Sequence, residues 1–163
     1  LVGALAWMLM MPATATDEAL FADNFESFES DLPSFRGGTD GEEITTLQIF
    51  ERAMESYGNE EYAESASFFD EYLSTDPDNH FATFYGGLAN LETNNAQKAI
   101  ELFRQTIEND TNDYNKEAKW YLILAYLKNH DRETAIQNLK EYVADGINYK
   151  TKKANILLEN ITH

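Results

Sequence analysis

Few side chains in this sequence are of the types that carry out catalysis or hold a metal ion. The histidines lie far apart in the chain, at His80, His130 and His163. None of them has a second histidine or a glutamate at metal-binding helical spacing. Asp110, Asn112 and Asp113 resemble the start of a calcium loop, but the glycine and the closing glutamate of such a loop are not in position. We therefore expect no catalytic residues, no metal and no cofactor, and a protein that is not an enzyme.

The distribution of charge narrows the classes of partner. The formal net charge is -17; residues 17–78 contain 18 acidic and two basic side chains, whereas residues 79–163 contain 11 acidic and 10 basic ones. Because nucleic acids are bound by cationic groups that displace counterions from phosphates, we expect no nucleic-acid partner. The acidic half is interpreted as a solvated face, with a docking patch for a basic partner as the alternative. The absence of cysteine excludes disulfides and thiolate sites.

An apolar run occupies the beginning of the chain. Residues 1–11 read LVGALAWMLMM and are followed by Pro12. This run is shorter than the about 20 residues that span a bilayer, and since the chain begins with Leu we interpret it as part of a longer hydrophobic segment. Ala13-Thr14-Ala15 resembles a signal cleavage site, so residues 1–15 are read as the end of a signal peptide or of a transmembrane anchor. The third alternative is a buried N-terminal helix. The first two predict an extracytoplasmic (periplasmic-side) protein, membrane-anchored or secreted.

Composition and internal repetition predict a helical chain. Ala, Leu, Glu, Lys and Gln dominate the sequence after this run, which favours helix. Three segments align on small residues separated by 34 and 36 positions, namely Ser65, Ala99 and Ala135. Four residues after each comes a large apolar one, namely Phe69, Phe103 and Leu139. A small side chain lets the two helices of a hairpin approach closely, and the large one fills the space one turn along.

Polar residues and glycines mark the expected helix ends. Asp78 or Asn79, and Asp131, offer side-chain acceptors to the free backbone amides at a helix start. Gly58 and Gly146 can adopt the left-handed conformation that ends a helix. The connections are therefore short, and neighbouring helices are expected to be antiparallel.

With these features the chain resembles the tetratricopeptide repeat (TPR) family, whose period is 34 residues. The stretch KWYLILAYLKNHDRETAI follows the family's first helix, turn and second-helix start, and Pro77 matches the proline that ends a repeat. The resemblance covers roughly residues 44–148, and residues 149–161 look like the family's capping helix. It implies an all-α fold, a right-handed superhelical array of about three TPR-like helix-turn-helix repeats with a C-terminal capping helix, over residues 43–163 in all.

The same resemblance implies a concave groove that binds a protein or peptide partner and is lined by the first helix of each pair. The register assigns to this groove Phe50, Met54, Tyr57, Phe84, Tyr85, Leu88, Leu91, Trp120, Tyr121, Leu124 and Leu127. Packing between repeats is the alternative role for many of these side chains.

Residues 16–36 are predicted to form an extra N-terminal amphipathic helix followed by a linker. Phe21, Phe25, Phe28 and Leu32 fall at i, i+4, i+7 and i+11, which is one stripe of a helix. An apolar groove open to water would promote association. We therefore expect this stripe to dock on the array, either permanently or until a partner displaces it.

These features favour a TPR-type protein–protein interaction scaffold or adaptor, tethered to a membrane through its N-terminal segment. The alternative is the extracytoplasmic regulatory arm of a membrane signalling protein of the anti-sigma kind, because the stretch FADNFESF followed by LPSFRGG looks like the juxtamembrane segment of anchored repeat proteins. A purely structural oligomer is a further alternative, which sedimentation would test.

Overall fold

The computed structural model of the chain describes residues 15–29, 45–108, 113–146 and 149–162. Most of the apolar segment 1–15 lies outside these residues, and so do Leu32 and the predicted linker to residue 36. In the part of the chain that is described, no helix combines the length and apolar character needed to cross a membrane.

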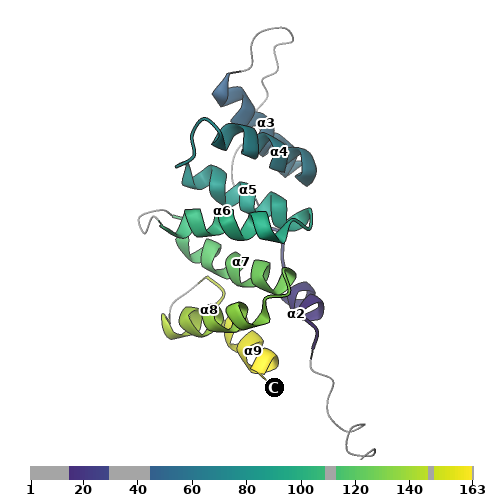
Figure 1. Cartoon of the computed structure of the whole chain (residues 1–163), viewed down its shortest axis with the longest axis vertical. Coiled ribbons are helices and arrows are strands. Elements are labelled where there is room, and N and C mark those ends of the chain that lie inside the picture. The colour runs from purple at the N-terminus through teal and green to yellow at the C-terminus, as the bar shows by residue number, and fades with distance from the viewer. Residues whose placement is uncertain (1–14, 30–44, 109–112, 147–148, 163) are drawn as a thin grey trace, which may run out of the picture.

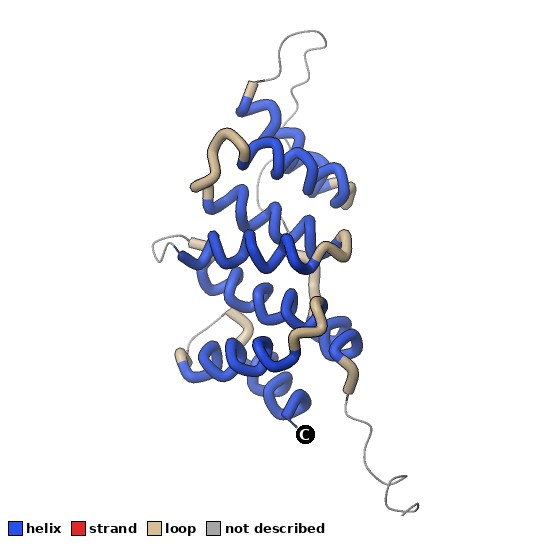
Figure 2. Tube along the Cα trace, viewed as in Figure 1, coloured by secondary structure: helices blue, strands red, loops and turns tan. Residues whose placement is uncertain are grey.

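The described residues form eight helices and no strand, which confirms the all-α prediction. The helices are α2 (Asp17–Asn24), α3 (Thr46–Gly58), α4 (Tyr62–Leu73), α5 (His80–Glu92), α6 (Ala96–Glu108), α7 (Asn115–Lys128), α8 (Arg132–Ala144) and α9 (Thr151–Thr162). From α3 to α8 each helix packs on the next, and the six stack in chain order along the long axis (Figure 1). Helix α9 packs on α8, and α2 returns to contact α7 and α9. Figure 2 shows the short turns that join the helices into hairpins.

The spaced small and large residues lie inside the three hairpins. All six have no exposed surface: Ser65, Ala99, Ala135, Phe69, Phe103 and Leu139. Ser65, the one polar member, donates its hydroxyl hydrogen to the backbone carbonyl of Ala53 across the first hairpin, at 2.9 Å. Equivalent sequence positions therefore occupy equivalent buried positions, which makes the fold repeat-like.

The three hairpin turns share one backbone geometry. Each contains a non-glycine residue with positive φ, namely Glu60 (63°), Asn94 (67°) and His130 (58°). In each turn this residue's N–H and the next one bond back to carbonyls near the end of the preceding helix, as in a Schellman motif. Gly58 was predicted to supply the left-handed conformation in the first turn, and this was wrong. It is the last residue of α3, and the backbone reverses two residues later, at Glu60.

Other predicted helix ends hold. The Asn79 side chain accepts a hydrogen bond from the Ala82 amide, and Asp131 accepts one from the Thr134 amide. Gly146 has a φ of 86° after α8. Local side-chain chemistry therefore sets most of the boundaries.

Helices α5 and α7 are buried on every side, whereas an amphipathic helix leaves one face exposed to water. Every residue from Ala82 to Leu91, and every residue from Trp120 to Leu127, is buried. A helix that is buried all round needs cover on its second face as well as its first. Part of that cover is the N-terminal segment, residues 15–29.

Candidate functional site

The N-terminal segment changes conformation halfway along its length. Helix α2 ends at Asn24, and Phe25 has extended backbone angles (φ -76°, ψ 132°). A helix is therefore present within the predicted residues 16–36, but it ends before Phe25 and Phe28, so the prediction that these two residues share a helical stripe with Phe21 was wrong. The physical reason is that tertiary partners take the backbone carbonyls of Glu26 and Phe28, which a helix would have bonded internally.

Helix α2 is attached to the turn between α7 and α8 by basic side chains. Arg132 pairs with Asp17 at 3.3 Å and donates to the Ala15 carbonyl at 2.9 Å. The Lys128 ammonium lies 4.7 Å from the centre of the Phe21 ring. His130, one of the three histidines, lies 3.8 Å from a Glu18 carboxylate oxygen. The acidic first turn of the helix is thus placed against positive charge.

The ring of Phe28 is surrounded by other aromatic rings. Five of them lie with centroids 5.1 to 6.4 Å from it, and we call this set the aromatic face: Phe84, Tyr85, Tyr114, Tyr121 and Tyr149. Four of the five contacts are edge-on, the arrangement that aromatic quadrupoles favour. Phe25 lies against Tyr121 at 6.2 Å and stacks on Phe21 at 4.9 Å. Helices α5 and α7 supply most of the aromatic face, so it sits at the middle of the stack (Figure 1).

Residues 25–29 follow α2 outside any helix, starting with the extended backbone of Phe25, and we call them the extended residues. Two buried tyrosine hydroxyls donate hydrogen bonds to their backbone. Tyr121 donates to the Glu26 carbonyl at 2.8 Å, and Tyr57 donates to the Phe28 carbonyl at 2.9 Å. Burial raises the pKa of both hydroxyls well above the usual value for tyrosine, so both stay protonated and able to donate. Because they bond carbonyls rather than side chains, these contacts do not depend on which residue supplies the backbone.

Charged groups hold the edge of the same segment. The Glu26 carboxylate pairs with Lys150 at 2.8 Å and also with Lys153. Hydrogen bonds from these two lysines lower the pKa of Glu26 from 4.5 to about 2. On the other side of the segment, the Ser27 hydroxyl donates to Glu92. Lys150 immediately precedes α9 and Lys153 lies in its first turn, so the C-terminal helix contributes directly to this site.

The residues assigned to a groove from the sequence differ in burial and in what they contact. Phe50 is half-buried and the others are buried: Met54, Tyr57, Phe84, Tyr85, Leu88, Leu91, Trp120, Tyr121, Leu124 and Leu127. Tyr57, Phe84, Tyr85 and Tyr121 contact the extended residues. Trp120 instead packs on Tyr142 of α8, inside the hairpin.

Two further kinds of contact at this site were not predicted from the sequence, those of two tyrosine rings and those of two lysines. Tyr114 and Tyr149 lie just before α7 and α9, outside the helices to which the groove was assigned from the sequence. Lys150 and Lys153 were interpreted only as parts of a capping stretch. Both lysines lie in residues 79–163, where basic residues nearly balance acidic ones. That local charge balance is the signal in the sequence that could have indicated them.

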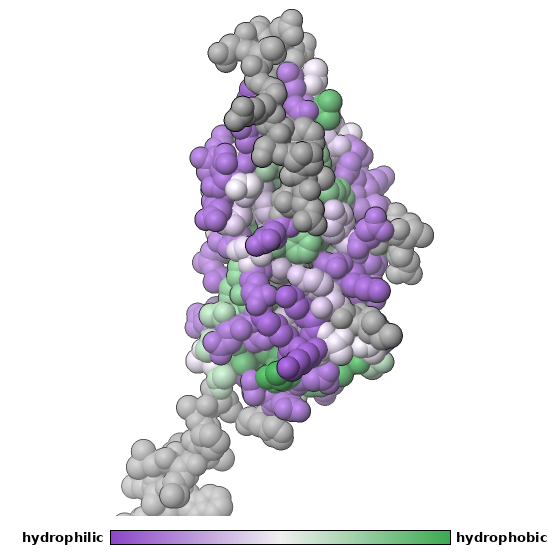
Figure 3. All heavy atoms as spheres, turned by 180° about the vertical axis from the view of Figure 1, so that it is seen from behind, coloured by the Kyte–Doolittle hydropathy of each residue, from purple (hydrophilic) through white to green (hydrophobic). Residues whose placement is uncertain are grey.

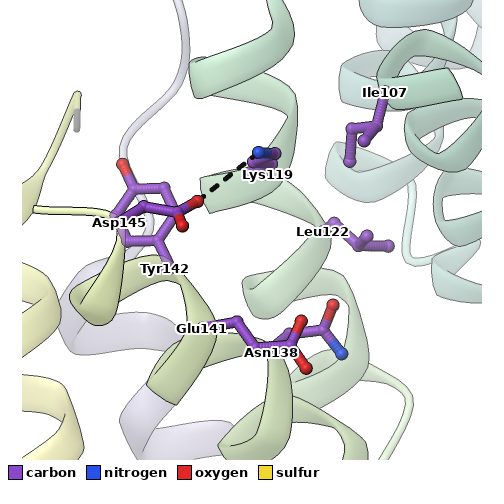
Figure 4. A pocket seen from close by; sticks show the side chains of 7 residues that line it. All are labelled: Ile107, Lys119, Leu122, Asn138, Glu141, Tyr142 and Asp145. Atoms are coloured by element: carbon purple, nitrogen blue, oxygen red, sulfur yellow. Dashed lines mark ion pairs between the residues drawn. The ribbon is translucent and has the colours of Figure 1, made fainter. Parts of the chain in front are cut away.

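Away from the N-terminal segment the described residues also form hollows. One of about 160 Å³ lies between α6, α7 and α8 and is crossed by the Lys119–Asp145 ion pair at 3.6 Å (Figure 4). Its lining residues are Ile107, Lys119, Leu122, Asn138, Glu141, Tyr142 and Asp145. Sites for small molecules usually enclose about 300–1,000 Å³, so this hollow is too small for most of them. On the face seen in Figure 3, hydrophilic side chains predominate and apolar ones gather in separate small patches.

The chain matches no protein-family model and no curated protein at a significant level. Its class is therefore defined by the fold and the site alone. Its described residues form a repeat-like stack of helices, and residues 25–29, which lie outside any helix, are seated on an aromatic face.

Proposed function

We propose that this chain is a protein–protein interaction module of the TPR type that binds an extended segment of a protein partner on its aromatic face. The observation that carries the proposal is the seating of residues 25–29 on that face. A surface that holds one extended segment through backbone carbonyls and aromatic rings has the chemistry to hold another.

The way the aromatic face is built supports this role. The hydroxyls of Tyr57 and Tyr121 are fixed in the packed stack, so little side-chain freedom is lost when a carbonyl binds to them. Aromatic side chains give large contact areas at low entropic cost, which is why they are common where proteins bind peptides. Each of these hydroxyls donates to a backbone carbonyl, which is a binding contact, and the role we propose is not enzymatic.

The TPR-type arrangement is supported by the repeats themselves. The positive-φ residues recur after 34 and 36 positions, the same intervals as the buried small residues. Similar intervals with the same turn geometry are typical of a regular stack, and regular stacks of helical hairpins present one long face to partners.

We include a location in the proposal. The apolar run at residues 1–11 and the small residues after it support an extracytoplasmic module, tethered to a membrane or secreted. Cell fractionation of a tagged protein tests this part. Recovery in the membrane or periplasmic fraction agrees with it, and recovery as an untethered cytosolic protein contradicts it.

The binding role is tested with a chain whose own segment is locked in place. Because the sequence contains no cysteine, Ser27→Cys and Glu92→Cys introduce a single pair that a short thiol-reactive linker can bridge. These positions are in contact, so the linker fixes residues 25–29 on the aromatic face. Linked and unlinked forms of the same double variant are then used as bait in extracts.

The expected result is a partner captured by the unlinked chain and lost on linking. If the two forms capture the same proteins in equal amounts, binding occurs elsewhere on the molecule and the proposed site is wrong. Circular dichroism of both forms provides the control that linking leaves the helices intact.

A further inference from the structure

The residues seated on the aromatic face also indicate what a partner must offer. This inference rests on the proposed function and adds the chemistry of the ligand to it. The seated residues read Phe25-Glu26-Ser27-Phe28-Glu29; they lie outside any helix, and the backbone of Phe25 is extended. Phe28 and Glu26 make the side-chain contacts that any occupant would have to reproduce.

The position of Phe28 selects an aromatic ring. Its side chain is half-buried, and the aromatic face meets it from several directions at centroid distances from 5.1 Å. An aliphatic side chain would fill part of this space but would lose the edge-on ring contacts, which are worth about 0.5–1.5 kcal/mol each beyond the buried area.

The position of Glu26 selects a negative charge. It meets two lysine ammonium groups, Lys150 and Lys153, in a chain with a net charge of -17. Two cations on one carboxylate form a local positive spot on a molecule whose net charge is negative. A basic side chain at this position would be repelled and would leave both lysines without this carboxylate partner.

A second positive region fixes the direction of the ligand. Lys128 and Arg132 face Phe21 and Asp17, which precede the extended residues in the chain. Acidic and aromatic residues on the N-terminal side of the ligand therefore find complementary groups, whereas the reversed sequence would not.

We propose that the aromatic face selects acidic peptide segments of the form aromatic–acidic–any–aromatic in an extended conformation, and that residues 25–29 are a resident competitor for that site. A protein partner carrying such a segment displaces them. The competition is intramolecular, so the resident segment acts at an effective concentration of the order of millimolar and sets the threshold a partner must exceed.

The test uses the full chain and a labelled synthetic peptide with the sequence of residues 16–30, TDEALFADNFESFES. Two variants weaken the resident segment: Phe28→Ala removes its ring, and Glu26→Lys reverses an exposed charge without touching the core. We expect the peptide to bind each variant at least about tenfold more tightly than it binds the unmodified chain, because the competitor is weakened.

Altered peptides supply the specificity controls. Peptides with Glu26→Lys or with Phe28→Ala are expected to bind the Glu26→Lys chain at least about fivefold more weakly than the parent peptide. A last control exchanges the charges of the peptide and of the protein. A Lys150→Glu, Lys153→Glu chain should prefer the Glu26→Lys peptide over the parent, because the signs of the contact are then reversed together.

The outcomes separate the inference from the proposed function. If parent, scrambled and Glu26→Lys peptides bind the variants equally, the face binds peptides without this selectivity, so the inference is wrong and the proposed function stands. If no peptide binds either variant at about 1 mM while both remain helical, the inference and the peptide-binding function are both wrong.

Discussion

At the scale of single residues, the site combines contacts that differ in their chemical selectivity. The hydroxyls of Tyr57 and Tyr121 bond backbone carbonyls that every residue carries. Lys150 and Lys153 bond one carboxylate, that of Glu26. The first kind of contact holds an extended chain, and the second selects which chain it is. Each can be removed without the other.

Acid is expected to loosen the extended segment through Glu26. The pKa of this carboxyl falls from 4.5 to about 2 when the segment is docked, so docking favours the ionised form. The contribution is therefore complete above about pH 4.5 and is lost as the pH falls towards 2. Chemical shifts of the Phe28 ring, followed by NMR across this range, should report the loosening. A Glu26→Gln chain serves as the control, and an identical acid transition in it would contradict the assignment.

Removing the Tyr121 hydroxyl is expected to open the same segment at neutral pH. Tyr121→Phe leaves the Glu26 carbonyl without its donor, at a net cost of about 1 kcal/mol, or roughly a fivefold rise in local opening. Hydrogen exchange of residues 25–29 measures this opening. Tyr126→Phe is the matched control, since that hydroxyl bonds Arg104 and lies outside the contacts of the segment. Equal effects of the two substitutions would argue against a specific role for Tyr121.

At the scale of the helices, the sequence predicts the hairpins well and the N-terminal segment poorly. The positions of Ser65, Ala99 and Ala135 are decided by local spacing, because close helix packing demands small residues at a fixed interval. The end of α2 at Asn24 is decided by distant groups, since Tyr57 and Tyr121 take carbonyls that a longer helix would bond itself. No local pattern near Phe25 contains that information. The apolar surface of α5 and α7 indicates only that something must cover them.

The approach of α5 to α6 is expected to depend on Gly87. A Cβ at this position would lie 2.8 Å from a ring carbon of Phe103, whose side chain is fully buried. Gly87→Ala should therefore lower the free energy of unfolding by about 1–3 kcal/mol, seen as a lower midpoint in urea. At the end of α3 a Cβ on Gly58 would meet nothing within 4 Å. There Gly58→Ala should raise stability by up to about 1 kcal/mol through helix propensity. A destabilised Gly58→Ala chain would contradict this explanation.

The hairpin turns are expected to gain stability from glycine at the left-handed position. Glu60 has a φ of 63°, where a side chain costs about 1–2 kcal/mol in most residues, and its side chain is exposed. Glu60→Gly should raise the free energy of unfolding by about 0.5–1 kcal/mol, after the larger entropy of glycine in the unfolded chain is counted. Glu61→Gly, at a φ of -83°, is the control and should give no gain. If both substitutions destabilise the chain equally, strain at Glu60 is not the cause.

At the scale of the whole molecule, the N-terminal segment contacts helices at both ends of the stack, α3 and α9. Residues 15–29 contact α7, the start of α8 and α9, and they reach Tyr57 at the end of α3. The sequence suggested an apolar surface that needs cover and a Phe-rich segment able to cover it. The extended conformation and the pairing of Glu26 with Lys150 and Lys153 could not be predicted from it, because both depend on where the chain returns in space.

The proposed competition for the aromatic face is tested most directly by following the displacement of residues 25–29 in the unmodified chain. The labelled protein is titrated with the unlabelled peptide of residues 16–30, and the amide signals of Glu26 to Glu29 are observed by NMR. We predict that these signals move to random-coil positions as the peptide saturates, while the ring signals of Tyr121 stay those of an occupied site. Signals of residues 25–29 that remain unchanged while the peptide binds would contradict it, because the peptide would then occupy another surface.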